Sequence, residues 1–434
     1  MLPRIVRYLA MGLCASALAL TASSCGSAAS PSAPASGGGG ASGGGGGGGG
    51  GATGSGNVKV DFSACPASMQ PVWFAYQDGA GAWTAVTGSN HVYQFNVMQS
   101  KGGFAYVWPT SNGQTQTFVD LYTQSQLTSF PFSFCPATGT NSMAGTVAGL
   151  DSAQEASVSL AQGYSLTAYP ETNYALNNMS SGNVDLVAWE TGVFGASASD
   201  KVIIRRNVAV QNDGVIPVLD FSSAEAKSAA TGTITVANAG GGTLVAEMAY
   251  YTGSSCTGHG LLYFLSPPTS PFTAYGVPAS LQNASDFHAL TVGVSNGNNS
   301  AGVLDIFHTM GNRTETFAPP ISQPTMSVLS GSYKRLQAVF TLPTDYSGEA
   351  SMVYHDAGSA HSFEVNETAG YIGGTSVTFA TPDFSAVSGF TATWEPATGT
   401  TTNWIVQASG GNLTGHSPCQ EGGRGVSDEI TGSN

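Results

Sequence analysis

The stretch Val72-Trp73-Phe74-Ala75-Tyr76-Gln77-Asp78-Gly79-Ala80-Gly81-Ala82-Trp83-Thr84-Ala85-Val86 decides the fold class. Two apolar runs lie on either side of an Asp-Gly pair, which is a strong short-range signal for a β-hairpin. Two later runs, Tyr93 to Val97 and Phe104 to Trp108, alternate large apolar residues with others at a period of two. That period indicates strands. We therefore expect residues 57–137 to form an aromatic-rich β-sandwich.

The same pattern continues along the chain. Short apolar runs closed by Gly, Asn or Asp recur up to the C-terminal region, which is the rhythm of β-sandwiches. One hairpin is expected around Asn296-Gly297, and the alternation from Leu336 to Leu342 predicts a half-buried strand. Residues Ser222 to Ala230 are a candidate helical connector. The expected divisions are a signal peptide (1–24), a lipidated cysteine and disordered linker (25–56), sandwiches at 57–137, 138–226, 227–321 and 322–425, and a disordered tail (426–434).

Composition restricts the classes of partner. The chain has 12 Lys and Arg and 26 Asp and Glu, for a net charge of -14, and charged residues make up only 9% of it. An acidic protein is a poor partner for nucleic acid or for anionic lipid headgroups. Ser, Thr, Asn and Gly replace the charged residues that stabilise helix surfaces, which also favours strands.

The N-terminal region predicts export. Arg4 and Arg7 precede an apolar run from Tyr8 to Leu20, which is too short for a comfortable membrane span and is typical of a signal peptide. Small residues then precede Cys25. We expect Cys25 to carry a lipid, the alternative being ordinary cleavage that leaves it a stray thiol. The segment from Gly26 to Gly56 contains only Gly, Ser, Ala, Pro and Thr, so it cannot bury apolar surface and should act as a flexible tether.

Four cysteines follow Cys25. An even number in an exported chain suggests two disulfides, and four cysteines allow three pairings. The segments before Cys65 and Cys135 echo one another, Asp-Phe-Ser-Ala-Cys-Pro against Pro-Phe-Ser-Phe-Cys-Pro, so we pair those two. Cys256 and Cys419 then remain to pair with each other. Metal binding by these cysteines is the alternative, although their spacing matches no common zinc motif.

Several segments resemble known families. Leu20 to Gly26 resembles the bacterial lipoprotein cleavage box, although the family's usual Leu three residues before the cysteine is Ala22 here. The first module resembles the immunoglobulin-like modules of bacterial surface proteins, and the second resembles carboxypeptidase-regulatory-like or transthyretin-like sandwiches. The segment Phe390 to Pro396, with Trp404 to Gln407, resembles early strands of a fibronectin type III domain. Too little chain follows it for a full domain, so we expect it to be the closing hairpin of a related sandwich.

Catalytic and metal motifs are weak. Gly293-Val294-Ser295-Asn296-Gly297 matches the nucleophile elbow, but that motif needs a helix after it, and the residues here are poor helix formers. A hairpin loop is therefore expected. His355, Asp356 and His361, or Asp305 with His308, lack the spacing of a known metal motif. We expect no catalytic residues, no metal and no cofactor.

Two further features bear on ligands. Asp185, Glu247, Asp305 and Glu364 alternate onto what should be solvated strand faces, so a pair of carboxylates for glycoside hydrolysis is not favoured. Four aromatic residues, Trp73, Trp83, Tyr106 and Trp108, are candidates for a platform that stacks on sugar rings or peptide. The alternative is that these four fill the core.

These observations predict an all-β protein of tandem antiparallel, immunoglobulin-like β-sandwiches on a Gly-rich tether. We expect an exported lipoprotein, anchored in the outer membrane or at the cell surface, with a display, adhesion or ligand-binding role. Its expected partners are the membrane, through the lipid, and a carbohydrate or protein ligand. The alternative is an extracellular or periplasmic hydrolase, directed at polysaccharide, with β-rich accessory modules. A solute-binding protein is disfavoured because strands and helices do not alternate.

Overall fold

The computed structural model describes residues 56–109, 113–135, 139–160, 163–192, 200–253, 258–265, 269–358, 360–413 and 420–434. These residues form strands, with short helical turns at a few connections. None of the helices in these segments is long and apolar enough to cross a bilayer. The expected fold class, tandem β-sandwiches, is confirmed.

Three modules share one seven-strand plan. In each, the third, second, fifth and sixth strands lie side by side in a large sheet, and the first strand lies between the fourth and the seventh in a small sheet. The first and seventh strands run parallel. The sequence does not reveal this repeat, because it resides in strand pairing and not in shared residues.

The strands of these modules follow in chain order. The first module has β1 (Val58–Asp61), β2 (Trp73–Asp78), β3 (Thr84–Ala85), β4 (Val92–Phe95), β5 (Lys101–Pro109), β6 (Thr115–Thr123) and β7 (Phe132–Ser133). The second has β8 (Asn141–Ala148), β9 (Gln154–Leu160), β10 (Gly163–Ala168), β11 (Asn173–Met179), β12 (Gly182–Gly192), β13 (Lys201–Val210), β14 (Gly214–Asp220) and an added β15 (Lys227–Ser228). The third has β16 (Ala230–Ala237), β17 (Thr243–Thr252), β18 (Gly258–Leu265), β19 (Phe272–Gly276), β20 (Phe287–Asn296), β21 (Asn299–Phe307) and β22 (Arg313–Thr316).

The fourth module varies the plan. Its large sheet has the same order, but β23 takes the edge place of the seventh strand and runs antiparallel to β24. Its strands are β23 (Thr325–Leu329), β24 (Arg335–Thr341), β25 (Glu349–Asp356), β26 (His361–Thr368), β27 (Ser376–Ala380), β28 (Thr402–Gly411) and β29 (Gly423–Ser433).

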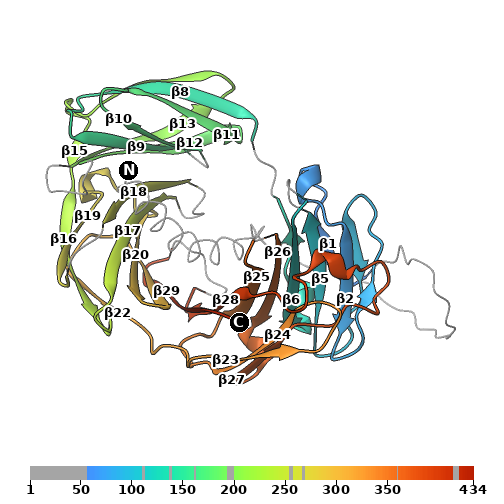
Figure 1. Ribbon diagram of the computed structural model, residues 1–434. Coiled ribbons are helices and arrows are strands. Elements are labelled where there is room, and N and C mark those ends of the chain that lie inside the picture. Colours follow the sequence, from blue (N-terminus) through green and yellow to red (C-terminus); the bar gives the residue numbers. More distant parts are fainter. Residues whose placement is uncertain are drawn as a thin grey trace, which may run out of the picture.

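The large sheets of the third, fourth and first modules join into one sheet of 12 strands. Strand β21 pairs antiparallel with β29, and β26 pairs in parallel with β6. In Figure 1 the four modules follow an arc, and the fourth module lies beside the first, with the β23-β24-β27 sheet on the outer side. The last module of the chain is therefore paired with the first module.

The sheet of the first module is covered on both faces. Phe74, Phe104 and Tyr106 pack against the β4-β1-β7 sheet, while Trp73, Val107 and other residues of the opposite face belong to the core of the fourth module. This explains the apolar residues on both faces of β5. Burial on both faces removes water from a large apolar area and fixes the register of the junction.

The second module keeps a separate sheet. Val187, Trp189 and Val202 share a core with the third module, which they meet through side chains. Arg206 of β13 reaches across to Asp286, with 2.5 Å between Nη2 and Oδ2. The carboxyl group of Asp286 is fully buried, and it also accepts hydrogen bonds from Tyr250 and from the backbone of Asn283 and Gly253.

Three expectations about local structure are wrong. Residues 426–434 are not a disordered tail, because β29 pairs with both β21 and β28. The segment Phe390 to Pro396 is not a strand but a loop with a 3-10 turn, and the closing hairpin is formed by β28 and β29. Ser222 to Ala230 forms turns and the short strand β15 in place of a helix, since Lys227 and Ser228 pair with β13.

Candidate functional site

A cleft of about 440 Å3 lies where the first and fourth modules meet. Both modules contribute side chains, and the set mixes aromatic, hydroxyl, amide and charged groups. The lining residues are Gln77, Trp83, Lys101, Leu121, Glu367, Tyr371, Ile372, Ser376, Thr378, Ala380, Pro382 and Asp383. A volume of this size lies within the usual range for small-molecule sites.

The floor of the cleft is one row of residues across four strands. Gln77 of β2 is paired with Gly103 of β5, which is paired with Leu121 of β6, which is paired with Glu367 of β26. A Cβ atom at Gly103 would lie 2.5 Å from Cδ2 of Leu121. It would also clash with the backbone oxygen of Asp120, so the close pairing of β5 with β6 at the floor requires glycine here.

The walls come from the fourth module. On β27, Ser376, Thr378 and Ala380 are exposed and alternate with buried residues, so one face of this strand is turned toward the cleft. The other contribution comes from the single turn α3 (Ala369–Ile372), which carries Tyr371. Thr368 caps this turn by accepting a hydrogen bond from the Tyr371 backbone, and Gly373 ends it with φ of 72°.

Charged groups at the cleft have partners. The Lys101 ammonium lies 4.5 Å from the centroid of the Tyr371 ring, which joins the two modules by a cation–π contact. Asp383 is 3.4 Å from Arg335, and hydrogen bonds from Ser385 lower the pKa of its carboxyl group. Burial raises the pKa of Glu367 to about 7, an effect that Lys101 opposes. The cleft therefore contains one ionised carboxylate and one that is partly protonated at neutral pH.

The four aromatic residues of the expected platform do not form one surface. Trp73 and Trp83 belong to the face that meets the fourth module, where both contact Phe384, and Trp73 donates to Ser388 O at 3.1 Å. Tyr106 and Trp108 pack on the opposite face against Phe118. Trp73 and Tyr106 are only 6% and 3% exposed, so they are core residues. Trp83 is half-buried and lines the cleft.

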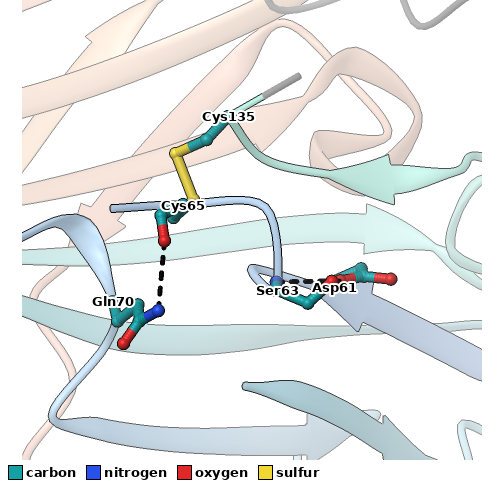
Figure 2. Close-up of a disulfide and its surroundings, with 5 residues drawn as sticks. All are labelled: Asp61, Ser63, Cys65, Gln70 and Cys135. Carbon is teal, nitrogen blue, oxygen red and sulfur yellow. Dashed lines mark hydrogen bonds between the residues drawn. A yellow bond between two sulfur atoms is a disulfide. The ribbon is translucent and has the colours of Figure 1, made fainter. Parts of the chain in front are cut away.

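The pairing of Cys65 with Cys135 is confirmed (Figure 2). The bond joins the segments after β1 and after β7, which are neighbouring strands of the small sheet. Beside it, the Gln70 amide donates to the Cys65 carbonyl oxygen at 3.1 Å, and Ser63 donates to Asp61. Cys25, Cys256 and Cys419 lie outside the described residues.

Ser295 lies at a strand-to-strand turn. It is the penultimate residue of β20, and after Gly297, with φ of 62°, the chain continues into β21. The expected hairpin is present, and the helix that a nucleophile elbow needs is not formed by these residues. Ser295 instead belongs to a row of polar residues that crosses eight strands of the large sheet: Asp120, Asn366, Ser351, Gln407, Glu429, Ser300, Ser295 and Thr243.

The histidines of the weak motifs bind separate partners. His355 Nδ1 contacts the backbone oxygen of Asp356, and His361 Nδ1 contacts the Thr115 hydroxyl at 2.6 Å. His308 contacts the backbone oxygen of Asp286 at 2.7 Å, and Asp305 pairs with Arg313. In the part of the chain that the structure describes, no three His, Cys, Asp or Glu side chains gather closely enough to hold a metal.

The expectation that four acidic residues face solvent is wrong. Glu247 is 6% exposed, and the side chains of Asp185 and Asp305 are 20% and 15% exposed in ion pairs with arginines. Burial also raises the pKa of Glu364. Alternation predicts which side of a strand a residue occupies, but neighbouring modules and arginines decide how far that side is covered.

Sequence reasoning missed most of the cleft. Of its lining residues, only Trp83 was a candidate. Leu121 and Glu367 are neighbours in space but 246 positions apart in the chain, and no local pattern marks such a pair. The one available signal was the apolar character of both faces of β5, which implied a second partner for that sheet.

The comparisons with known proteins leave the family open. No protein-family model matches the chain, and no curated protein does. Among solved structures, the chain is similar to the FN1-FN3 domains of chicken CNTN1, with 9% identity, covering 61% of this chain and 93% of that one, at a TM-score of 0.15. So low a TM-score carries no argument about arrangement or function. The sandwich architecture rests on the strand pairing described above.

Proposed function

We propose that this protein is a lipid-anchored envelope protein that binds an extracellular ligand in the cleft between its first and fourth modules. The observation that carries the proposal is the cleft itself, which is lined by Trp83 of the first module and Tyr371 of the fourth. A concave site that combines aromatic and polar side chains is a usual ligand site. The Gly-rich tether after Cys25 would hold this body away from the membrane.

The anchor has its own test. Mass spectrometry of the membrane fraction should find an acylated Cys25 at the mature N-terminus, and Cys25→Ala should move the protein into the soluble fraction. An unmodified mature protein recovered from the medium would remove the anchor and leave the cleft unaffected.

The cleft is tested by immobilising the intact exported body and probing it with arrays of glycans and of peptides. Binding that Trp83→Ala weakens, and that Phe130→Ala leaves unchanged, supports the proposal. Phe130 is a suitable control because it is an aromatic residue of the same module, 48% exposed and outside the cleft. Binding that is equally insensitive to both changes would place the ligand elsewhere.

A hydrolase is the second candidate. One observation favours it: Glu367 and Asp383 line the same cleft, and their environments shift their pKa values in opposite directions. Such a difference is typical of an acid and a base in glycoside hydrolysis. Release of reducing ends from polysaccharide by the native protein, lost in Glu367→Gln and in Asp383→Asn, would establish it. Ligand binding without turnover would leave the binding role alone.

A further inference from the structure

We infer that the ligand of this cleft is a neutral oligosaccharide, an inference that rests on the proposed binding function and narrows it to one chemical class. Three features of the described residues support it: the side chains of β27 that line the cleft, the two aromatic residues of the lining, and the pairing of the charges.

Strand β27 is the edge strand of the β23-β24-β27 sheet, but it lines the cleft with its side chains. Ser376, Thr378 and Ala380 are alternate residues of β27, so it is their side chains that line the cleft. Added peptide strands bind instead through the backbone N–H and C=O groups of a sheet edge. Two hydroxyl groups and a methyl group on a flat face offer hydrogen bonds without the backbone register that an extended peptide requires.

Two aromatic residues, Trp83 and Tyr371, line the cleft together with these polar side chains. The Trp83 ring packs edge-on against Phe384 at 5.2 Å between centroids, so its position is fixed by the core of the fourth module. Tyr371 is held on the capped turn α3. Sugar rings present C–H faces that pack on aromatic rings, and their hydroxyl groups bind amides, carboxyl groups and hydroxyls. Gln77, Glu367 and Thr378 supply all three kinds of group within the same cleft.

The charges of the cleft are already paired, which favours a neutral ligand. Lys101 lies over the Tyr371 ring, and Asp383 lies beside Arg335. Glu367 is 9% exposed and lies in the floor, where burial disfavours its charged form. An anionic sugar would compete with the Tyr371 ring for the Lys101 ammonium, and a cationic one would compete with Arg335 for Asp383.

The test uses the soluble exported body, residues 26–434, with its disulfide intact. Calorimetric titration with cellotetraose, xylotetraose, mannotetraose and chitotetraose is compared with titration by galacturonate tetramer and by a set of uncharged decapeptides. We expect at least one neutral tetrasaccharide to bind, with affinity about tenfold lower in Trp83→Ala. Trp83→Phe should restore most of that affinity, and Phe130→Ala should not change it. Unaltered thermal unfolding of each variant shows that it folds.

A double variant tests the wall that β27 forms. Removing the two hydroxyls by Ser376→Ala with Thr378→Ala should also weaken binding, without affecting the core, because both side chains are exposed. Peptide binding in the cleft without saccharide binding would overturn the inference and leave the proposed function standing. Preference for the galacturonate tetramer would overturn the neutral class. If no saccharide and no peptide binds in a way that depends on Trp83, both the inference and the proposed binding function are removed.

Discussion

Two junctions in this molecule are built differently. The fourth and first modules join by backbone hydrogen bonds between β26 and β6, and one face of the sheet there packs into the apolar core of the fourth module. The second and third modules meet through side chains, with Trp189 in the shared core and Arg206 bound to Asp286. The first junction cannot open without unfolding a sheet, whereas the second depends on a few groups that one substitution can remove.

Burying an unpaired charge at the first junction should have the largest effect. Val365 of β26 is 1% exposed and is paired with Val119 of β6 and Met352 of β25. We expect Val365→Asp to cost on the order of 4 kcal/mol or more and to prevent stable folding of the first and fourth modules. Val328→Asp is the matched control, since Val328 is 55% exposed on β23 and its change should cost less than about 0.5 kcal/mol. Urea unfolding measures both, and equal values would contradict the account of this junction.

Removal of the disulfide should come next. The bond joins residues separated by 70 positions, and chain-entropy reasoning for such a loop gives about 4 kcal/mol, within a usual range of about 2–5 kcal/mol. Cys65→Ser with Cys135→Ser should lower the unfolding transition that involves the first module and leave that of the second module unchanged. Calorimetry resolves the two. A common shift of all transitions would mean that the four modules unfold together.

The second junction should respond to Asp286→Ala. Arg206 keeps its ion pair with Asp185, but this change removes its buried partner and the acceptor of the Tyr250 hydroxyl, and breaking a buried pair costs roughly 3 kcal/mol. The adjacent residue Arg205 provides the control, because its partner Glu225 is 38% exposed and Glu225→Ala should cost less than about 1 kcal/mol. Small-angle scattering should show a larger radius of gyration for Asp286→Ala alone. An unchanged radius would show that the apolar contacts suffice to hold the second module.

A change in pH should affect the stability of the two junctions in opposite directions. Burial raises the pKa of Asp120 to about 8, of Glu349 to about 7 and of Glu395 to about 8. Because these values exceed those of the unfolded chain, the folded state binds more protons between about pH 8 and pH 4. The free energy of unfolding of the first and fourth modules should therefore rise as pH falls from 8 to 5. This added stability should be lost as pH rises again through 7 to 8.

Asp286 behaves in the opposite way. Although burial opposes it, hydrogen bonds from Arg206 and from backbone amides lower the pKa of Asp286 below its ordinary value. Its contribution is present above the pKa of the unfolded chain and is lost only as pH falls below about 4. Unfolding temperatures at pH 8, 6.5 and 5 test this, with Asp120→Asn expected to flatten the rise. If the unfolding temperature of the first and fourth modules decreased from pH 8 to pH 5, the prediction would be contradicted.

Local signals in the sequence predicted local structure well. Asp-Gly and Asn-Gly located two hairpins, alternation identified β24, and the repeated Phe-Ser-x-Cys-Pro segments identified the Cys65–Cys135 bond. The junctions were not predicted, because the pairing of β26 with β6 joins distant residues and their individual patterns read only as buried strands. Residues 426–434 were expected to be a disordered tail, whereas β29 is ordered by pairing on both sides. The cleft was missed for the same reason, since its lining residues belong to two different modules.

The closure of the large sheet by the fourth module has a consequence for biogenesis. Synthesis from the N-terminus completes Val119 and Leu121 of β6 long before Val365, the residue paired with Val119, is added to the chain. During that interval β6 presents an unprotected edge and an apolar surface, which is the kind of intermediate that aggregates or recruits chaperones. Truncated products that contain the first module and end before residue 349 should therefore be degraded or insoluble, although they retain both cysteines of the disulfide.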